Sequence, residues 1–573
     1  MSDITDALEI LINQGRYFEA RAKAASWLGD SSPIRSKQLY ALALSKCGVP
    51  EAAMQYLEPL YKQFPDDPET AGILGGIYKE IFIKTKDQRF AVLSKDTYLK
   101  NFNATKSYYT GINAATMSAV SGQAKQGQLI ASEVIALLND KQHDFWELAT
   151  LAESYLISKD RIKAKEYYLR VRNLITTDWG KINSIYNQLW LLNHYVAVPN
   201  ELLNIFKPPV IAAFIGHMID HPNRTQSRFP ASIENAIKEA LTSSITSLNA
   251  KIGYCSLACG GDILFAEAMA ETGGEVNIFL PFEQSDFIET SIRFAGDQWV
   301  ERFDRLVKKF PVTFVTHEPY DQFNDLFVLQ TGIIFGAAVM RSAVNHTKPH
   351  LFTLMSSLDS QRKVGGTRDT SKLWPYPENI TNINPDNFST SLRSNNQQTL
   401  QEYADNRKYK DRPVCYILLA DFPNTSPTEK ESFWKSAQSK MEMQSPLPLG
   451  LIWNGEAILV ACKSLEGVTD ICRILFDIVS RFQKKDNIRI SLHVGPVFVE
   501  MEEESIGKKI EGNAVKILQE IHHYSTPGEV YASSQFALEM ALAINQYSID
   551  YGGKFFTEGM NNSQEIFRIG FAK

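Results

Sequence analysis

The sequence has few cysteines, no excess of basic residues and no long apolar run, and each absence excludes a class of protein. Its six cysteines are scattered through 573 residues, which is typical of reduced thiols and not of a disulfide framework. The net charge of −6 offers no general attraction to nucleic acid or to an anionic membrane. No stretch reaches the ~18 uninterrupted apolar residues of a membrane span, and the N-terminus lacks a secretory pattern. We therefore expect a cytoplasmic protein that binds neither membrane nor nucleic acid.

The first 200 residues predict a run of amphipathic helices separated by short turns. Apolar residues recur at helical spacing from Ile4 to about Asn193. The segments GRYFEARAKAASWL and QLYALALSKCGVPEAAMQYLEPLYKQ pair small residues with aromatics in helix-turn-helix units, which resembles tetratricopeptide repeats. SYYTGINAATM and DFWELATLAESYL further resemble the TRAF-binding helical region of stress-activated MAP kinase kinase kinases and its bacterial relatives. We expect residues 1–200 to form a helical repeat domain that can hold a protein partner.

A different pattern begins at Lys207, Pro208 and Pro209. Short apolar segments, including VIAAFIG, KIGYCSLAC, VNIFLPF, VTFVTHE and HLFTLMS, alternate with stretches of helical periodicity. This alternation is typical of a parallel α/β sheet, whose strands are buried on both faces. We expect a Rossmann-like domain over residues 208–378.

Glycine turns at the ends of these strands point to phosphate binding. In SLACGGDILFAEAMA a strand runs into Gly260 and Gly261 and directly into a helix, whose free amides favour an anion. A tight turn explains the two glycines equally well, so that alternative stays open. The loop after the first strand adds two arginines that could clamp a phosphate. The residues that we predict to bind a nucleotide, in these turns and beside them, are Gly216, Arg224, Arg228, Gly260, Gly261, Asp262, Gly365, Gly366 and Thr367.

The strings GHMID, SLACGGDILFAEA and GGTRDT together resemble the SLOG superfamily of Rossmann-like nucleotide-binding domains. The resemblance covers residues 208–376 and implies that this domain binds a nucleotide or a nucleotide-derived messenger. Some members cleave N-glycosidic bonds, and for that reaction Glu267 and Asp262 are the carboxylates that the sequence places best. In the alternative, Asp262 caps the helix and Glu267 lies on its polar face.

Residues 379–410 are rich in Asn, Ser and Thr, and we interpret them as a polar linker. The remaining residues, 411–573, predict an α+β domain with a largely antiparallel sheet. Four of its segments, YILLADFPNTS, LIWNGEAILVAC, IRISLHVGPV and EGNAVKILQEIHHYSTPGEVYAS, resemble class III nucleotide cyclases. The resemblance implies a ferredoxin-type fold that dimerises, because class III sites form between two subunits. It also implies that Asp421 and Glu456 hold Mg²⁺ or Mn²⁺ with a nucleotide.

The matched catalytic positions of this domain depart from the cyclase pattern. Lys516 stands where the family has its transition-state asparagine, and Glu520 stands where it has an arginine that neutralises phosphate charge. The positions that select the base hold Ile452 and Lys509. We expect a pseudo-cyclase, in which His522 and His523 of the same motif are surface residues at a helix end.

Three interpretations of this domain remain. It is a dimerising pseudo-enzyme that binds a nucleotide or a partner, or an active enzyme in which Lys516 takes over the phosphate contact as a catalytic residue, or an inherited fold whose Asp421 and Glu456 are only turn residues.

Taken together, the three parts predict a nucleotide-linked signalling regulator, and the resemblances imply a bacterial signalling or defence setting. The alternatives are a divergent metal-dependent cyclase, or a nucleotide N-glycosidase in the central domain with Glu267 as its catalytic carboxylate. The fold class that we expect is multidomain: helical repeats, then an α/β domain, then an α+β domain.

Overall fold

The structure is a computed structural model that describes residues 2–29, 31–138, 144–176, 178–222, 224, 227–320, 325–357, 367–388, 412–481, 487–500, 506, 509–544, 546–556 and 563–571. The chain divides into two compact units. The first holds residues 1–208 with 551–556, and the second holds residues 209–550 with 557–573.

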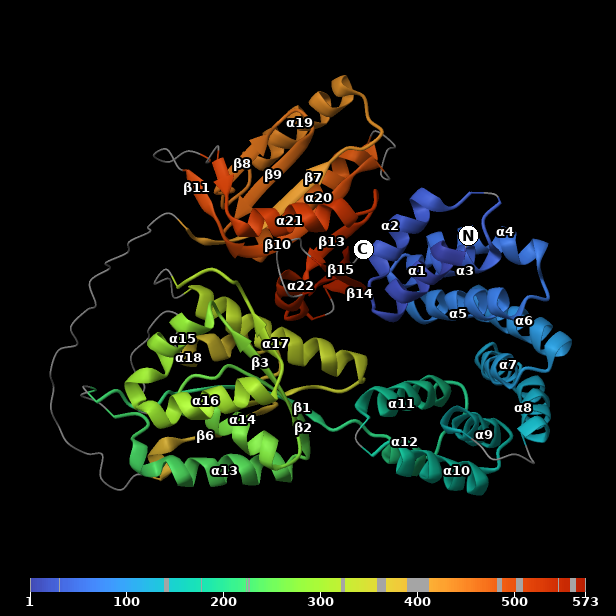
Figure 1. The fold of residues 1–573 in the computed structure, drawn as a ribbon, viewed down its shortest axis with the longest axis horizontal. Helices are drawn as coiled ribbons and strands as arrows, with labels where there is room; N and C mark the ends of the chain where they lie inside the picture. The colour runs from blue at the N-terminus through green and yellow to red at the C-terminus, as the bar shows by residue number, and fades with distance from the viewer. Residues whose placement is uncertain are drawn as a thin grey trace. The chain divides into compact units, whose positions relative to one another are not determined.

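The first unit is built from helices in sequence order (Figure 1). They are α1 (Ser2–Asn13), α2 (Tyr17–Trp27), α3 (Ile34–Lys46), α4 (Pro50–Gln63), α5 (Pro68–Thr85), α6 (Gln88–Thr105), α7 (Tyr108–Val120), α8 (Ala124–Leu138), α9 (Phe145–Ile157), α10 (Arg161–Leu174), α11 (Trp179–Asn193) and α12 (Asn200–Ile205).

Local sequence explains where several of these helices begin and how closely they pack. Asp67 caps α5 by accepting a hydrogen bond from the Thr70 amide, and Asp144 forms a capping box with Glu147 at the start of α9. A Cβ atom on Gly75 would lie 2.7 Å from the Tyr98 ring, so only glycine lets α6 approach α5 this closely. The predicted helical repeats are confirmed.

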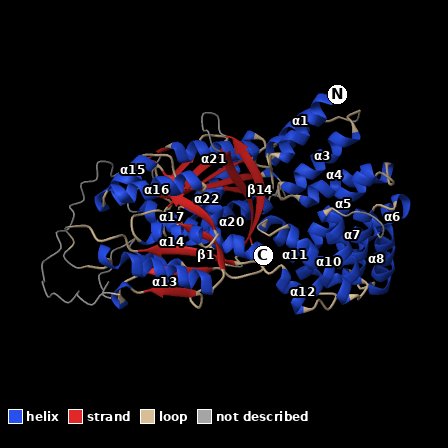
Figure 2. Ribbon diagram, turned by 60° about the horizontal axis from the view of Figure 1, so that its bottom comes forward, coloured by secondary structure: helices blue, strands red, loops and turns tan. Residues whose placement is uncertain are grey.

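The second unit begins with a six-stranded sheet, which Figure 2 shows in red among its helices. Its strands are β1 (Val210–Gly216), β2 (Ala250–Cys255), β3 (Glu275–Leu280), β4 (Val312–Phe314), β5 (His350–Leu354) and β6 (Ile380–Ile383). Their order is β4-β3-β2-β1-β5-β6, and every recorded pairing is parallel. The α-helices of this part are α13 (Glu234–Ser247), α14 (Gly261–Glu271), α15 (Gln284–Ser291), α16 (Asp297–Lys309), α17 (Asp325–Val344) and α18 (Thr367–Thr370). The predicted parallel sheet is confirmed.

Strand β6 corrects the predicted linker, which was expected to begin at residue 379. Ile383 is buried in the core of the parallel sheet. The Asn382 side chain accepts hydrogen bonds from the Thr353 hydroxyl at 2.9 Å and from the Met355 amide at 3.1 Å. A short polar strand depends on the neighbour that completes its hydrogen bonds, and composition alone does not reveal that neighbour. Residues 389–411 of the predicted linker lie outside the described residues.

The last part carries a seven-stranded sheet with the order β14-β15-β13-β10-β7-β9-β8, in which β10 and β13 are parallel. Its elements are β7 (Val414–Asp421), α19 (Pro427–Met441), β8 (Gly450–Trp453), β9 (Ala457–Cys462), α20 (Leu465–Arg481), β10 (Arg489–Pro496), β11 (Phe498–Glu500), β12 (Lys509–Glu511), α21 (Asn513–Tyr524), β13 (Val530–Ser533), α22 (Ser534–Ala541), β14 (Tyr547–Phe556) and β15 (Ser563–Phe571). The order β10-β7-β9-β8 with two crossing helices is the predicted ferredoxin-type arrangement, and the other recorded pairings are antiparallel.

Helix α17 links the two sheets of the second unit. By length and composition it is the one helix of the described residues that could cross a membrane, and 61% of its most apolar window is buried. One side packs on β1, and the other side packs on α22. A Cβ atom on Gly336 would lie 1.9 Å from the Leu538 carbonyl oxygen, so glycine is required for this close approach. One continuous apolar core therefore runs from Ile333 of α17 to Leu418 of β7.

Candidate functional site

Asp421, the first predicted metal ligand, is held by Arg489 and His522 of its own chain. The antiparallel register places Arg489, the first residue of β10, opposite Asp421, the last residue of β7. The Arg489 Nε donates to Oδ1 of Asp421 at 2.8 Å, and its Nη2 donates to Oδ2. The Nε2 atom of His522 lies 3.3 Å from Oδ1. Burial alone would raise the pKa of Asp421, but Arg489 and His522 hold this pKa well below its usual range.

His522 corrects the prediction that it lies on the surface. Only 8% of the residue is exposed, and its Nδ1 lies 3.0 Å from the Ser491 hydroxyl of β10. The reason is helical periodicity, since His522 follows the buried Leu518 by four residues and shares the face that packs on the sheet. His523, one residue further, is exposed as expected.

Glu456, the second predicted ligand, lies in the turn between β8 and β9. The Asn454 side chain accepts hydrogen bonds from the Glu456 amide at 2.9 Å and the Ala457 amide at 2.8 Å, which shapes the turn. The Glu456 carboxylate is 71% exposed and is paired with Lys430 of α19. Because Ala457 is paired with Asp421 across β7 and β9, the fold brings the two predicted ligand positions close together.

These two carboxylates do not fit a divalent cation. A metal would have to displace the Arg489 guanidinium, which already satisfies both oxygens of Asp421, and leave that guanidinium partly buried without a partner. Mg²⁺ and Mn²⁺ need carboxylate oxygens that are free to coordinate. Within the described ranges, no three His, Cys, Asp or Glu side chains gather as a metal site would require.

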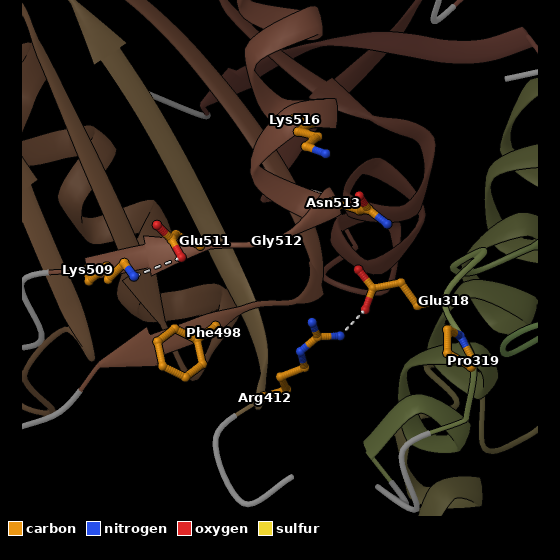
Figure 3. Close-up of a pocket in the computed structure, with 9 residues that line it drawn as sticks. All are labelled: Glu318, Pro319, Arg412, Phe498, Lys509, Glu511, Gly512, Asn513 and Lys516. Carbon is orange, nitrogen blue, oxygen red and sulfur yellow. Dashed lines mark hydrogen bonds and ion pairs between the residues drawn. The ribbon is translucent and has the colours of Figure 1, made fainter. Parts of the chain in front are cut away.

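Lys516, the residue that the sequence matches to the asparagine of class III cyclases, lines a pocket of about 570 Å³ in the second unit (Figure 3). Lys516 and Asn513 come from α21, whose N-cap is Gly512 at φ 136°, and no side chain caps this helix. The other lining residues are Phe498, Lys509 and Glu511 from β11 and β12, Arg412 before β7, and Glu318 and Pro319 after β4.

The pocket contains more positive than negative charge. Arg412 donates to the Glu318 carboxylate at 3.0 Å, and Lys509 pairs with Glu511 at 3.1 Å. Lys516 is exposed, and no carboxylate of the described residues pairs with it. Two further residues depart from the cyclase pattern but do not line this pocket. They are Glu520 on α21 and Ile452 on β8, and both are partly buried.

The glycine turn of the central sheet packs tightly on the segment after β1. A Cβ atom on Gly260, whose φ is +105°, would lie 2.5 Å from the Ile219 amide nitrogen. The Gly261 amide donates to the His217 carbonyl at 3.1 Å. Gly216 is similarly close-packed, since a Cβ there would lie 2.6 Å from the Phe214 ring. Close packing, against backbone at Gly260 and against side chains at Gly216, is thus a structural reason for glycine at these two positions.

Asp262 lies in the first turn of α14, at the carboxyl end of the parallel sheet. The strand order reverses beside β1, which pairs with β2 on one side and with β5 on the other. Ligands of open α/β sheets bind at such a reversal of strand order. The Asp262 carboxylate is 8% exposed and accepts a hydrogen bond from the Ala258 amide at 3.2 Å. Burial raises the pKa of Asp262 to about 7. It is thus a carboxyl group that can hold or release a proton near neutral pH.

Glu267, the other predicted carboxylate of the central domain, is bound in an ion-pair cluster. It is 7% exposed, and Arg302 of α16 donates to its two oxygens at 2.9 and 2.7 Å. Arg305 adds a contact at 3.0 Å, and Lys238 lies 3.4 Å away. Burial alone would raise the pKa of Glu267, but Arg302 and Lys238 keep it below its usual value. The Glu267 cluster therefore joins three helices, α13 through Lys238, α14 through Glu267, and α16 through Arg302 and Arg305.

The two arginines of the predicted phosphate clamp are organised around Asp220. Its carboxylate accepts hydrogen bonds from the Arg228 amide at 3.0 Å and the Ser227 hydroxyl at 2.5 Å, and Arg224 pairs with it at 3.3 Å. Of the predicted second glycine turn, Gly365 and Gly366 lie outside the described residues. Thr367 is the first residue of α18.

Comparisons with known proteins match separate parts of this chain. The Tetratricopeptide Repeats-Sensor family model matches residues 16–118. A thermophilic tetratricopeptide-repeat protein of Thermus thermophilus is 14% identical over 33% of this chain and 98% of its own, with a TM-score of 0.28. The adenylyl cyclase CyaB from P. aeruginosa is 11% identical over 28% of this chain and 96% of its own, with a TM-score of 0.23.

A guanylate cyclase domain from Catenaria anguillulae, solved in complex with GTP, is 13% identical. It covers 29% of this chain and 100% of its own, with a TM-score of 0.23. The family-model match alone shows tetratricopeptide-type repeats, over residues 16–118.

The sequence did not reveal the cations that hold the two predicted metal ligands. Arg489 opens the motif IRISLHVGPV, and its charge could have been noted as the antiparallel partner of the residue that ends β7. Lys430 lies on α19, 26 residues before its partner Glu456, and carries no comparable signal. Arg412 and Glu318 are 94 residues apart, so only the folded unit brings them together in the pocket.

Proposed function

We propose that this protein is a nucleotide-linked signalling regulator whose C-terminal domain does not catalyse nucleotide cyclisation. The observation that carries the proposal is the pairing of Asp421 with Arg489 and His522. A cyclase of this type needs two metal ions on free carboxylates to activate the 3′-hydroxyl and stabilise the triphosphate. Here Arg489 neutralises Asp421, and Lys430 neutralises Glu456.

The charges at the matched catalytic positions support the same conclusion. Lys516 is a mobile point charge and not a neutral amide, and Glu520 would repel the phosphates that an arginine would attract. A domain with these residues can bind a ligand or a second copy of itself without turning over a triphosphate. A homodimer through this domain is part of the proposal, since class III sites form between two subunits.

The central parallel sheet is the part that we propose to bind a nucleotide or a nucleotide-derived messenger. Its strand order reverses between β1 and β5. The backbone around Gly216, the turn at Gly260 and Gly261, and Asp262 lie there, at the carboxyl ends of the strands. The helical repeats of the first unit are the proposed surface for a protein partner, as stacked helix pairs commonly are. The proposed location is the cytoplasm.

A second candidate function, nucleotide N-glycosidase activity, is favoured by one observation at Asp262. Its pKa near 7 and its burial at the carboxyl end of the sheet are properties of a general acid. In that case the catalytic carboxylate is Asp262 and not Glu267, because Glu267 is already bound by Arg302.

Turnover assays test these proposals. The purified full chain is incubated with each NTP and with NAD, in Mg²⁺ or Mn²⁺, and the products are separated by liquid chromatography and mass spectrometry. The proposed function predicts no cyclic nucleotide. Cyclic product that disappears in Asp421→Ala would refute it, whereas base release that disappears in Asp262→Asn but persists in Glu267→Gln would establish the second candidate.

A further inference from the structure

We propose that helix α17 couples the glycine turn of the central sheet to helix α22 of the C-terminal domain, and that a proton on Glu539 holds the two helices together. The inference rests on the proposed function, because it connects the part that we propose to bind a nucleotide with the cyclase-like domain. Both helices belong to the second unit, in which α17 packs on β1 and β2 with one side and on α22 with the other (Figure 1).

The side of α17 that faces α22 carries two buried glycines, Gly332 and Gly336, which lie on one face because they are four residues apart. A Cβ atom on Gly332 would lie 1.6 Å from the Oε1 atom of Glu539. A Cβ atom on Gly336 would lie 1.9 Å from the Leu538 carbonyl oxygen. The Glu539 carboxyl group is therefore seated directly against the backbone of α17.

Glu539 has no cation that would balance a negative charge. The hydrogen bond recorded for its carboxylate comes from the Tyr416 hydroxyl of β7, at 3.0 Å, and no ion pair of the described residues includes it. The titratable residues on the elements that pack against α22 are Asp325 and Arg341 on α17, Arg489 and His493 on β10, Tyr531 on β13, and Glu565 and Arg568 on β15. All three arginines are paired with other carboxylates, namely Glu275, Asp421 and Glu529. Burial lowers the pKa of His493 to about 3, so it is uncharged near neutral pH.

The protonation state of Glu539 therefore decides how strongly the two helices are held. Burial raises the pKa of Glu539 to about 7, although the Tyr416 hydrogen bond opposes this rise. Below this pH the neutral carboxyl group packs against Gly332. Above it, an ion without a partner occupies the contact, and opening the contact returns that ion to water. Because the pKa in the closed contact is raised, the contact is strongest at low pH and weakens as the pH rises through about 7.

The opposite side of α17 holds the loop that leads to the glycine turn. Gln330 is 4% exposed, and its Nε2 donates to the Ser256 hydroxyl at 2.9 Å and to the Phe279 carbonyl oxygen. Ser256 is the first residue after β2, in the loop that continues into the glycine turn. Gln330 and Gly332 are two residues apart, so they point to opposite sides of the helix. A shift of α17 against α22 therefore displaces the group that holds this loop.

Hydrogen exchange of the full chain without nucleotide tests the proton link. Exchange at pH 6 and pH 8, corrected for the intrinsic rates, reports the free energy of local opening. If opening returns the pKa of Glu539 from about 7 to its ordinary value of 4.5, the α22 amides should open roughly tenfold more often at pH 8. Glu539→Gln keeps the shape but cannot ionise, and should change less than about threefold. The control is Glu431→Gln on α19, whose side chain is 49% exposed and which should behave as the wild type does.

The same exchange data test the coupling to the glycine turn. In the wild type, the amides of residues 256–261 should also open more often at pH 8, by at least about threefold relative to Glu539→Gln. Asp262 titrates near pH 7 in both proteins, so only the difference between them is compared. Gln330→Met removes the two hydrogen bonds at similar volume. It should abolish this difference in the loop and leave the pH response of α22 in place.

The inference is overturned if the wild type and Glu539→Gln show the same pH response at α22 or at residues 256–261, or if Gln330→Met leaves the loop response unchanged. Should Glu539→Gln disturb the fold, Tyr416→Phe is the second variant. Loss of the hydroxyl that stabilises the carboxylate should raise the pH at which the α22 response levels off, and an unchanged pH would equally refute the role of Glu539. Because no nucleotide is added, failure of nucleotide binding would refute the proposed function without altering these exchange rates.

Discussion

Replacing Asp421 with asparagine removes the carboxylate that Arg489 and His522 share while keeping its shape. In the folded chain the Asp421 side chain is 20% exposed and the Arg489 side chain is 27% exposed. Breaking a fully buried pair costs about 3–5 kcal/mol, and an exposed pair contributes about 0–1 kcal/mol. For this partly buried pair we expect a loss of about 2 kcal/mol of local stability, since the Arg489 guanidinium keeps only the weaker amide oxygen.

Hydrogen exchange of the β7 and β10 amides at pH 7 measures this loss, because exchange reports the free energy of local opening. A loss of about 2 kcal/mol corresponds to roughly 30-fold faster exchange. The control is Asp470→Asn on α20, whose pair with Arg473 is about half exposed and should change exchange by less than about threefold. Exchange in Asp421→Asn that equals the control would refute the reasoning.

The contribution of Asp421 to the stability of the folded chain should depend on pH in one direction. Because the folded pKa of Asp421 is depressed, its contribution to stability is present above the unfolded pKa of about 4 and is lost as the pH falls from there toward the folded pKa. In the wild type, the β10 amides should therefore exchange faster, relative to their intrinsic rate, as the pH falls below 4. Asp421→Asn should remove this part of the acid dependence.

Three further substitutions test contacts of the second unit. Gly336→Ala places a Cβ against the Leu538 carbonyl and should lower the stability of the α17–α22 contact by about 2 kcal/mol or more. Limited proteolysis should therefore cleave α22 faster than in the wild type, and unchanged cleavage would contradict this contact. Burial raises the pKa of Glu539 to about 7, so between pH 4.5 and 7 the unfolded chain loses this proton more readily than the folded chain does. The free energy of unfolding of the wild type should therefore fall by about 2 kcal/mol over this range, and thermal melting of Glu539→Gln should not show this fall. Glu267→Gln breaks the contact with Arg302 and should lower urea stability by about 2 kcal/mol without changing any base release; a loss of base release would restore a catalytic role.

Much of the fold follows from local pattern, and the exceptions are elements stabilised by distant partners. The apolar segment VIAAFIG indicated β1 because a strand buried on both faces needs continuous apolar residues, and five of its seven residues are buried. Ile380–Ile383 gave no such signal, because its side chains are mostly polar or exposed and its backbone hydrogen bonds depend on β5. A short polar strand is specified by its neighbour more than by its own composition.

The candidate sites divide in the same way. The sequence predicted that Asp421 and Glu456 converge, and the β7–β9 register does bring their positions together. It could not predict that Arg489 and Lys430 would neutralise them, since side-chain pairing across strands and helices depends on register and rotamer. The role of Lys516 in a pocket with Arg412 likewise depends on segments that are distant in sequence and adjacent only in the folded unit.

The most direct test of the central claim is a Mn²⁺ titration of the full chain followed by electron paramagnetic resonance, in which free Mn²⁺ gives a signal that bound Mn²⁺ loses. If Arg489 already neutralises Asp421 and His522 contacts the same carboxylate, the wild type and Asp421→Asn should take up equally little Mn²⁺ in the absence of nucleotide. Stoichiometric uptake by the wild type that Asp421→Asn abolishes would contradict the account, because it would mean that the metal displaces the guanidinium.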